Sequence, residues 1–544
     1  MAHKAQSMKQ VLVLAVGAIA VFGVFALPNH PDALTWGALN RWPLELPVVL
    51  LSMMVLGRRA VAINVIALAL VVLATLKLAD LAMFSAYNRA FNPIVDGSLI
   101  GAGLSLLHDS MGTAMTVAVV LTAMLVSVAF YVVLVRGLMA WADLGRTRRS
   151  SLAAGLFTVG CLGWAVADAG HHLKHWRFEN SPPGTTWSTR LAIGRIGTMQ
   201  ATLVDLAEFR ADAQSDIYSD RGDLLNRLDG HDVILIWIES YGRASFDNPL
   251  YAPTHLATLD AAQTDIAGLG LAMKSGWLMS PTAGGQSWLA HGALGSGLWT
   301  SDNGRYQAMI GSGKKWLFDI ARDAGYRTTA VMPAITRDWP ESAAMGFDLI
   351  FAEAAIPYAG APFHWVTMPD QFTLASYREL LSPDPRPEFI QIALISSHAP
   401  WTPVPDMVGW DDIGDGTIFN AMATRGPEPK VLWKDRNAVR DAYRRSLDYV
   451  LQAVFSHVVQ TDGRPPVFII AGDHQAAGFV AGSDNKDVPV HFVGPQRVLD
   501  QIDHWGWSDG LIPDADVPVR RMDSFRDDFI AAFSGELSTA MVAE

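Results

Sequence analysis

The chain has 544 residues, of which 50% are hydrophobic, and a formal net charge of −12 at pH 7. Its length exceeds that of a usual single compact domain, and its acidic balance argues against nucleic acid as a partner. The single cysteine, Cys161, excludes a disulfide within the chain, so a domain outside the cytoplasm would need a conventional hydrophobic core.

Long apolar runs occupy the N-terminal part of the chain. Most of them approach the ~20 residues that a helix needs to cross a bilayer, although the second run is short. A secretory signal peptide would not be followed by further runs of this kind, so we predict about five membrane crossings. The runs cover residues 11–27, 44–57, 60–83, 115–135 and 152–169.

Basic residues in the loops predict the orientation of these crossings. Lys4 and Lys9 precede the first run, and the loops after the second and fourth runs carry further arginines. The alternate loops hold only Arg41 and Arg89 as basic residues. By the positive-inside rule the N-terminus lies in the cytoplasm, and an odd number of crossings places everything after about residue 170 outside.

Two charged residues, Lys77 and Asp80, interrupt the third apolar run near its outer end. Intramembrane charges often belong to functional sites. At this depth, however, both side chains can reach the interface or pair within one helical turn. We favour this structural interpretation.

The rest of the chain divides into a connector and an α/β domain. Residues 171–230 form a polar juxtamembrane linker with helix-like spacing after Ser188 or Thr189, either of which is a plausible N-cap. Residues 231–544 alternate strand and helix patterns, which predicts a mostly parallel sheet flanked by helices. The expected strands are 233–238, 326–333, 389–396, 467–472 and 488–494, and the expected helices include 314–325 and 435–459. A transmembrane domain, residues 1–170, precedes both.

Polar residues follow three of the predicted strands where each strand ends. Glu239 follows the strand 233–238, His398 follows 389–396, and Asp473 with His474 follows 467–472. Because a parallel sheet brings the carboxyl ends of its strands to one edge, these side chains are expected to meet. Their mixed oxygen and nitrogen donors suit Mn²⁺ or Zn²⁺ better than Ca²⁺.

A glycine-rich turn, "PTAGGQSWLAHGALGSG" over residues 281–297, supplies a further element. Gly284 and Gly285 permit a tight turn, and Ser287 then stands at the start of an amphipathic stretch. A serine in that place is either a helix N-cap or a nucleophile. A metal nearby would favour the nucleophile, because coordination lowers the pKa of a hydroxyl.

Together these features resemble the membrane sulfatase-like transferases of the alkaline phosphatase superfamily, most closely the lipoteichoic acid synthase and phosphoglycerol transferase type. The resemblance rests on the N-terminal crossings, a strand ending in Glu, the glycine-rich turn, "SSH" and "GDH". It covers nearly the whole chain and is strongest over 231–494. It implies one Mn²⁺, with Zn²⁺ or Mg²⁺ as alternatives, and a substrate site. The implied metal ligands are Glu239, Ser287, Asp473 and His474, and the implied substrate contacts are His398 and Trp339.

The chain departs from the family pattern in two places. The family nucleophile is usually a Thr, where this chain has Ser287, and Thr282 is the alternative nucleophile. The family also has an Arg two residues after the Trp, where this chain has Glu341. Arg337 could supply the missing charge from the other side of Trp339.

The resemblance implies transfer of a phosphoglycerol head group from phosphatidylglycerol to an extracytoplasmic glycan or glycolipid. Ser287 would attack phosphorus and form a phosphoserine, with His398 as proton donor to a leaving oxygen. The expected location is the bacterial cytoplasmic membrane, with the catalytic domain on its periplasmic side.

Three other functions stay open. Phosphoethanolamine transferases of the same superfamily usually carry several disulfides, which one cysteine cannot form. A sulfatase or phosphodiester hydrolase is the second, although sulfatases need a C/S-x-P-x-R sequence that we do not find. The third is an inactive membrane-tethered domain that binds a glycan or lipid. Loss of the usual Thr and Arg fits decay, but the proposed ligands remain chemically competent.

Overall fold

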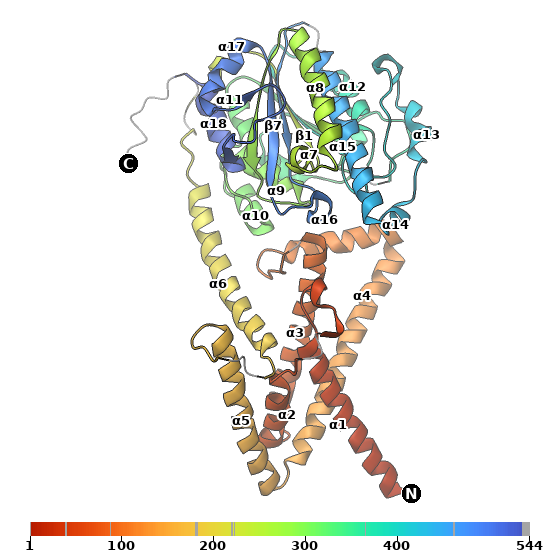
Figure 1. Cartoon of the computed structure of the whole chain (residues 1–544), viewed down its shortest axis with the longest axis vertical. Helices are drawn as coiled ribbons and strands as arrows, with labels where there is room; N and C mark the ends of the chain where they lie inside the picture. Colours follow the sequence, from red (N-terminus) through yellow and green to blue (C-terminus); the bar gives the residue numbers. More distant parts are fainter. Residues whose placement is uncertain are drawn as a thin grey trace. The chain divides into compact units, whose positions relative to one another are not determined.

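The structure is a computed structural model in which the chain forms two compact units, Met1–Asp205 and Leu206–Glu544 (Figure 1). The unit boundary falls within α6, Trp187–Ala213, in the segment predicted as a linker. The predicted catalytic domain runs to residue 544, and its last nine residues lie outside the described ones. The structure describes residues 2–37, 41–87, 89–179, 183–218, 221, 224–364, 366–460 and 463–535.

The first unit is helical, and four of its described helices are long and apolar enough to cross a membrane. The second predicted run instead forms a helix of 12 residues, α2. At 1.5 Å per residue α2 is about 18 Å long, shorter than the ~30 Å hydrocarbon core, so four long helices and a short one stand where about five crossings were expected, and a crossing by α2 stays a prediction. The helices are α1 Ala2–Ala26, α2 Glu45–Leu56, α3 Ala60–Tyr87, α4 Gly97–Leu144 and α5 Arg148–His172.

The short α2 still reverses the direction of the chain within this unit. Arg58, between α2 and α3, pairs with Asp143 at the end of α4, with 2.6 Å between Nε and Oδ1. Trp141 donates from Nε1 to the carbonyl oxygen of Leu14 in α1 at 3.1 Å. The first half of α1, the α2–α3 turn and the α4–α5 turn therefore lie at one end of the unit. These are the segments whose basic residues predict a cytoplasmic location, which stays a prediction.

Lys77 and Asp80 do not pair with each other, contrary to one of the two structural explanations. Lys77 Nζ donates to the carbonyl oxygens of Val24 and Phe25 at 3.0 Å and to Ser188 Oγ at 2.7 Å. Asp80 accepts two hydrogen bonds from Arg195 at 2.6 and 2.7 Å. Both charges are fully buried and have polar partners.

The expected helix caps in the linker are also wrong. Helix α6 begins at Trp187, before either proposed cap. Ser188 contacts Lys77, and the Oγ1 and N–H of Thr189 donate to Glu45 at 3.1 and 3.0 Å. These polar side chains join distant parts of the first unit, so their local cap-like spacing misled the prediction.

The second unit contains a nine-stranded sheet in the described residues, with the order β4-β3-β5-β1-β6-β7-β2-β8 and β9 beside β2. Neighbouring strands from β4 to β6 are parallel, whereas β7 is antiparallel to both β6 and β2. The mostly parallel sheet is thus confirmed. The strands are β1 Val233–Ile238, β2 Ala272–Met279, β3 Arg327–Met332, β4 Leu349–Ala352, β5 Glu388–Ala393, β6 Val467–Gly472, β7 Asp487–Gly494, β8 Ser508–Asp509 and β9 Val519–Arg521.

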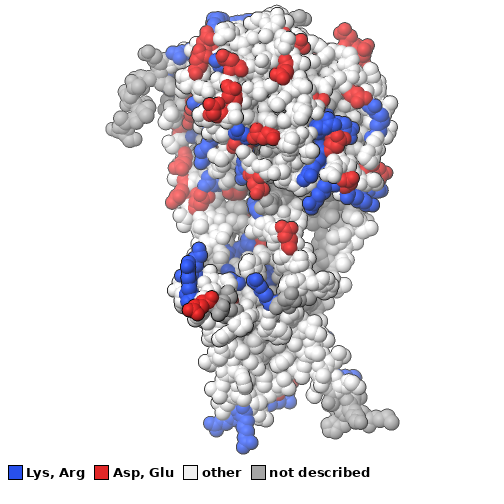
Figure 2. Space-filling model, in the orientation of Figure 1, with Lys and Arg blue, Asp and Glu red and all other residues white. Residues whose placement is uncertain are grey.

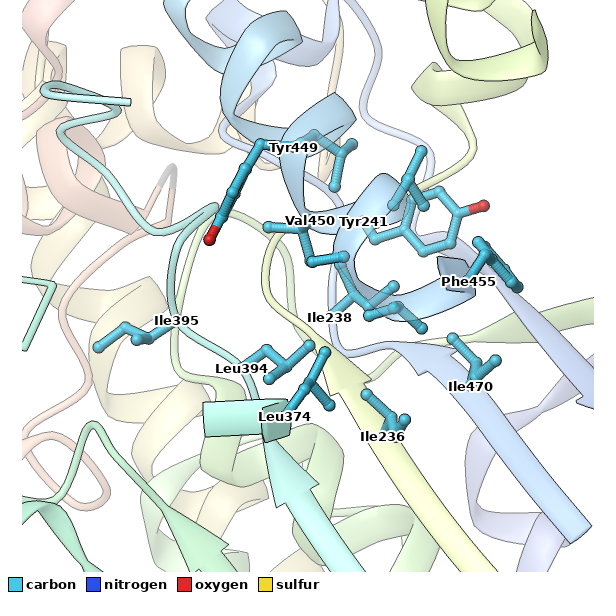
Figure 3. Close-up of a cluster of buried hydrophobic side chains, with 14 of the residues drawn as sticks. Ile236, Ile238, Tyr241, Leu374, Leu394, Ile395, Tyr449, Val450, Phe455 and Ile470 are labelled. Carbon is cyan, nitrogen blue, oxygen red and sulfur yellow. The ribbon is translucent and has the colours of Figure 1, made fainter. Parts of the chain in front are cut away.

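Helices cover both faces of the sheet, which explains why its central strands are apolar throughout. In β1, Ile234, Ile236 and Ile238 belong to one hydrophobic core, shown in part in Figure 3, while Leu235 and Trp237 belong to the other. Figure 1 shows α8 and α15 on one side and α11 and α18 on the other. The longer helices are α8 Ala252–Gly268, α9 Ser287–Ser296, α10 Asn303–Ile310, α11 Leu317–Asp323, α12 Asp370–Leu380, α15 Arg436–Val459 and α18 Phe525–Phe533. Short helices are α7 Ala244–Asp247, α13 Asn420–Ala423, α14 Pro429–Leu432, α16 Gly478–Ala481 and α17 Gln496–Leu499.

The order of the central strands brings three loops to one edge of the sheet. Strand β1 lies between β5 and β6, and Trp237 pairs with Ala393 on one side and Ala471 on the other. Since all three strands run in the same direction, the segments that follow them meet at their carboxyl ends.

Candidate active site

Asp473 links the ends of β1 and β6. One of its carboxylate oxygens, Oδ1, accepts hydrogen bonds from the backbone N–H groups of Ser240 at 2.8 Å and His474 at 2.6 Å. Ser240 has a positive φ of 59°, which turns the chain sharply after Glu239. The side chain of Asp473 is buried, and its second oxygen, Oδ2, faces the neighbouring histidine. The Asp473 carboxylate therefore fixes the backbone at the carboxyl ends of β1 and β6 through Oδ1, and its Oδ2 faces the site at this edge of the sheet.

A hydrogen bond from the loop after β5 fixes the backbone of Glu239. Ser397, in the loop after β5, donates from Oγ to the carbonyl oxygen of Glu239 at 2.6 Å. Ser240 donates from Oγ to Glu239 Oε1 at 3.0 Å, leaving Oε2 for another partner. The loops after β1 and β5 are thus tied together by hydroxyl groups.

The glycine-rich turn presents Ser287 to these carboxylates. Gly284, Gly285 and Gln286 have φ values of 73°, 138° and 66°, and only the glycines adopt such a conformation without strain. Helix α9 begins at Ser287, as predicted. Thr282, the alternative nucleophile, donates from Oγ1 to the carbonyl oxygen of Gly285 at 2.8 Å and so closes the turn.

Four of the predicted residues converge on one point. Ser287 Oγ lies 2.8 Å from Glu239 Oε2 and 3.3 Å from His474 Nε2. His474 Nε2 lies 3.2 Å from Glu239 Oε1 and 3.9 Å from Asp473 Oδ2. The other ring nitrogen of His474, Nδ1, donates to the carbonyl oxygen of Gln475 at 3.0 Å, which orients Nε2 toward the cluster.

The charges of this cluster favour a cation. Burial, together with the charge of Glu239, raises the pKa of Asp473 to about 8. Burial lowers the pKa of His474, but the charges of Asp473 and Glu239 outweigh it and raise that pKa to about 9. Burial likewise raises the pKa of Glu239, yet the charge and hydrogen bond of His474 bring it well below its ordinary value.

The donor set also has the geometry of a metal site. One atom from each of Glu239, Asp473 and His474 lies within 4.8 Å of the others. Two carboxylates and an imidazole are ligands that Mn²⁺ and Zn²⁺ accept. These residues therefore fit a divalent cation, which would take the place of the protons that the cluster otherwise binds.

The other predicted site residues, His398, Trp339 and Arg337, are not part of the four-residue cluster. His398 is exposed and directly follows Ser397, whose hydroxyl donates to the carbonyl oxygen of Glu239. Trp339 is half-buried and packs against Phe347, with 6.3 Å between ring centroids, and against the hydrophobic cluster that contains Leu289. Arg337 is exposed in the same loop. The structure thus gives Trp339 a packing role, and a substrate role for Trp339 and Arg337 stays a prediction.

One neighbour of the cluster, His291, was not predicted from the sequence. It lies one turn after Ser287 on α9, and its ring stacks on Trp237 with 4.4 Å between centroids. Burial lowers the pKa of His291 to about 3, and its buried Nε2 has no hydrogen-bond partner in the described part of the chain. The four-residue spacing from Ser287 was the available signal, because such residues share a helix face.

A family model described as Sulfatase matches residues 274–488. The matched range includes Ser287, His398, Asp473 and His474, whereas Glu239 precedes it. No curated protein sequence matches the chain.

Solved structures are similar in fold to part of this chain. The lipoteichoic acid synthase LtaP from Listeria monocytogenes is 14% identical, with 53% of this chain and 71% of that chain covered and a TM-score of 0.31. The phosphoglycerol transferase GacH from Streptococcus pyogenes, in complex with sn-glycerol-1-phosphate, is 15% identical over 62% and 82%, with a TM-score of 0.34. The lipooligosaccharide phosphoethanolamine transferase A from Neisseria meningitidis is 14% identical over 55% and 86%, with a TM-score of 0.38.

Proposed function

We propose that the chain is a metal-dependent phosphotransferase in which Ser287 is the nucleophile. The observation that carries this proposal is the position of Ser287 Oγ, within 2.8 Å of Glu239 Oε2 and 3.3 Å of His474 Nε2. Gln286 and not Ser287 is the N-cap residue of α9, and the hydroxyl of Ser287 donates to Glu239.

The start of α9 supplies a second feature that suits phosphate. The first N–H groups of a helix have no acceptor within the helix and point toward its N-terminus. Together with the helix dipole they favour an anion there. Ser287 and Trp288 are the first two residues of α9, so their N–H groups can receive phosphoryl oxygens beside the hydroxyl.

Glu239, Asp473 and His474 would hold the cation, with Mn²⁺ as the expected ion and Zn²⁺ or Mg²⁺ as alternatives. Such an ion neutralises charge on phosphoryl oxygens and favours an ionised hydroxyl at the nucleophile. The backbone contacts of Asp473 and the Nδ1 contact of His474 would keep these ligands oriented.

The proposed reaction has two displacements at phosphorus. Ser287 Oγ forms a bond to the phosphorus of a phospholipid, the bond from phosphorus to the diacylglycerol oxygen breaks, and His398 gives that oxygen a proton. A hydroxyl of an extracytoplasmic glycan or glycolipid then attacks the phosphoserine, and Ser287 leaves. Phosphatidylglycerol is the expected donor, and the membrane-spanning helices would keep the enzyme near it.

One experiment tests both the reaction and the head group. Purified full-length protein is given labelled phosphatidylglycerol or phosphatidylethanolamine, with Ser287→Ala as the control. We expect diacylglycerol from phosphatidylglycerol and none from the Ala variant. Release from phosphatidylethanolamine alone would reassign the head group. Absence of turnover and of bound metal would instead favour an inactive binding domain.

A further inference from the structure

The second unit has an exposed patch of mixed apolar and basic side chains at and after α14. Val431 and Trp433 are 52% and 44% exposed and lie two positions apart in the chain. Lys430, Lys434 and Arg436 are exposed beside them. We call these five residues the α14 patch.

The exposed tryptophan of the patch is held on a rigid support. Its ring stacks on Trp401 with 5.8 Å between centroids and 4° between planes, and it meets the edge of Phe479 at 5.8 Å. Its Nε1 donates to the carbonyl oxygen of Pro400 at 3.4 Å. Trp433 is therefore ordered by three neighbours and yet keeps much of its surface in solvent.

The patch is also basic in an acidic chain. Segment 425–445 has seven Lys or Arg residues and three Asp or Glu residues, a balance of 7 − 3 = +4, whereas the chain carries −12. Figure 2 shows Lys and Arg side chains gathered over α14 and the start of α15. Glu428 pairs with Lys430, and Asp435 caps α15. Within the described residues, neither Lys434 nor Arg436 has an acidic partner.

We infer that the α14 patch rests on the anionic headgroup surface of a lipid bilayer. Tryptophan favours the boundary between headgroups and acyl chains because its ring is apolar and its N–H is polar. Lys and Arg beside it are attracted to anionic lipids, and their stems can remain on apolar surface. A buried protein interface would instead be depleted of Lys.

The patch lies at the edge of the sheet that carries the candidate active site. Trp401, beneath Trp433, donates from Nε1 to the carbonyl oxygen of Ser397 at 2.6 Å. Ser397 in turn donates to the carbonyl oxygen of Glu239. Phe479, at the side of Trp433, lies in α16, the short helix that follows His474 after β6. A bilayer against the patch would thus lie next to the loops after β5 and β6, whatever reaction those loops perform.

A single-cysteine experiment on the full chain tests this contact. Cys161 is replaced by Ala, and one cysteine is introduced as Val431→Cys in the patch. The matched control is Leu269→Cys, because Leu269 is 50% exposed and lies between α8 and β2, at the opposite edge of the sheet. Each cysteine carries a nitroxide, and its collisions with a water-soluble relaxing agent are measured in detergent and in lipid nanodiscs.

We expect the label at 431 to be shielded from the relaxing agent in nanodiscs that contain phosphatidylglycerol. The label at 269 should stay accessible in all conditions. Shielding at 431 should decrease in nanodiscs of phosphatidylcholine alone and in a Lys434→Glu/Arg436→Glu variant. Circular dichroism and metal content must match those of the parent protein.

Three results would overturn the inference. Equal accessibility at 431 and 269 in anionic nanodiscs would show that the patch faces water. Shielding at 431 already present in detergent would assign the patch to a protein contact, such as a second copy. Equal shielding at 431 in nanodiscs with phosphatidylglycerol and in nanodiscs of phosphatidylcholine alone would show that the patch does not depend on anionic lipid. None of these readouts needs turnover, so failure of the proposed reaction is distinguishable.

Discussion

The Oγ atom of Ser287 lies 2.8 Å from Oε2 of Glu239, although 48 residues separate them in the chain. This contact argues against one of the two interpretations of a serine at a helix start, the N-cap. An N-cap serine would accept from the backbone of its own helix, whereas Gln286 occupies the cap position here and Ser287 donates to a distant carboxylate. The hydroxyl belongs to the cluster at the sheet edge.

Replacing Ser287 tests the nucleophile. Thr keeps the oxygen and should remain active, whereas Ala should stop diacylglycerol release while the protein stays folded. Asn should also be inactive, because its amide is a poor nucleophile. A residue that served only as a cap would behave otherwise: Ala would cost about 1 kcal/mol of stability and Asn would substitute well. Mass spectrometry of the trapped intermediate should locate a phosphoglycerol adduct on Ser287, and the same adduct on Thr282 would contradict the assignment.

Replacing the acidic ligands tests the metal site. Glu239→Ala and Asp473→Ala should each lose bound metal and turnover, measured by elemental analysis and diacylglycerol release. Asp473→Ala should also lower the free energy of unfolding by about 1–3 kcal/mol for each unpaired N–H, because it leaves those of Ser240 and His474 without their acceptor. Asp484→Ala, at an exposed position, is the control. Full metal occupancy in a ligand variant would place the site elsewhere.

Asp370 predicts how stability depends on pH. Its buried carboxylate accepts hydrogen bonds from the N–H groups of Ile395 at 2.8 Å and Ser396 at 3.1 Å, and burial raises its pKa to about 7 from an ordinary 3.8. Between these values the native state holds a proton that the unfolded chain releases. The free energy of unfolding should therefore fall, by a few kcal/mol at most, as pH rises through this window.

Asp370→Asn cannot ionise and should remove this pH dependence. Denaturant unfolding of the wild type, the Asn variant and an exposed control, Asp265→Asn, checks the expectation. The wild type and the control should lose stability between about pH 4 and about pH 7 relative to Asp370→Asn. Parallel curves for all three proteins would show that Asp370 does not hold a proton in the native state.

Reporter fusions test the orientation. Fusions near residues 145 and 300 should report opposite compartments, with residue 145 in the cytoplasm, because the basic turns lie at one end of the first unit. The test also reports whether the short α2 crosses the membrane. If α2 does not carry the chain across the membrane and the N-terminus is cytoplasmic, the two fusions would still report opposite compartments, but with residue 145 outside and residue 300 in the cytoplasm.

Local patterns made much of the fold predictable. Strands β1, β5 and β6 are buried on both faces, so they appear in the sequence as continuous apolar runs. By contrast β2 contains Lys274, Ser275 and Gly276, and its pairing between β7 and β8 was not visible in its own residues. β4 has only four residues, too few for a clear period.

The sequence by itself determined which chemical groups stand at the strand ends and at the start of α9, because burial and periodicity are properties of neighbouring residues. Only the tertiary structure decided which groups meet. The strand order β5-β1-β6 brings His474 Nε2 within 3.2 Å of Glu239 Oε1. The turn before α9 brings Ser287 within 3.3 Å of His474, 187 residues away, and assigns Thr282 to the backbone. The tertiary structure likewise decided the position of His291 beside the cluster and the separate partners of Lys77 and Asp80. Such contacts depend on packing between distant segments, which no local pattern records.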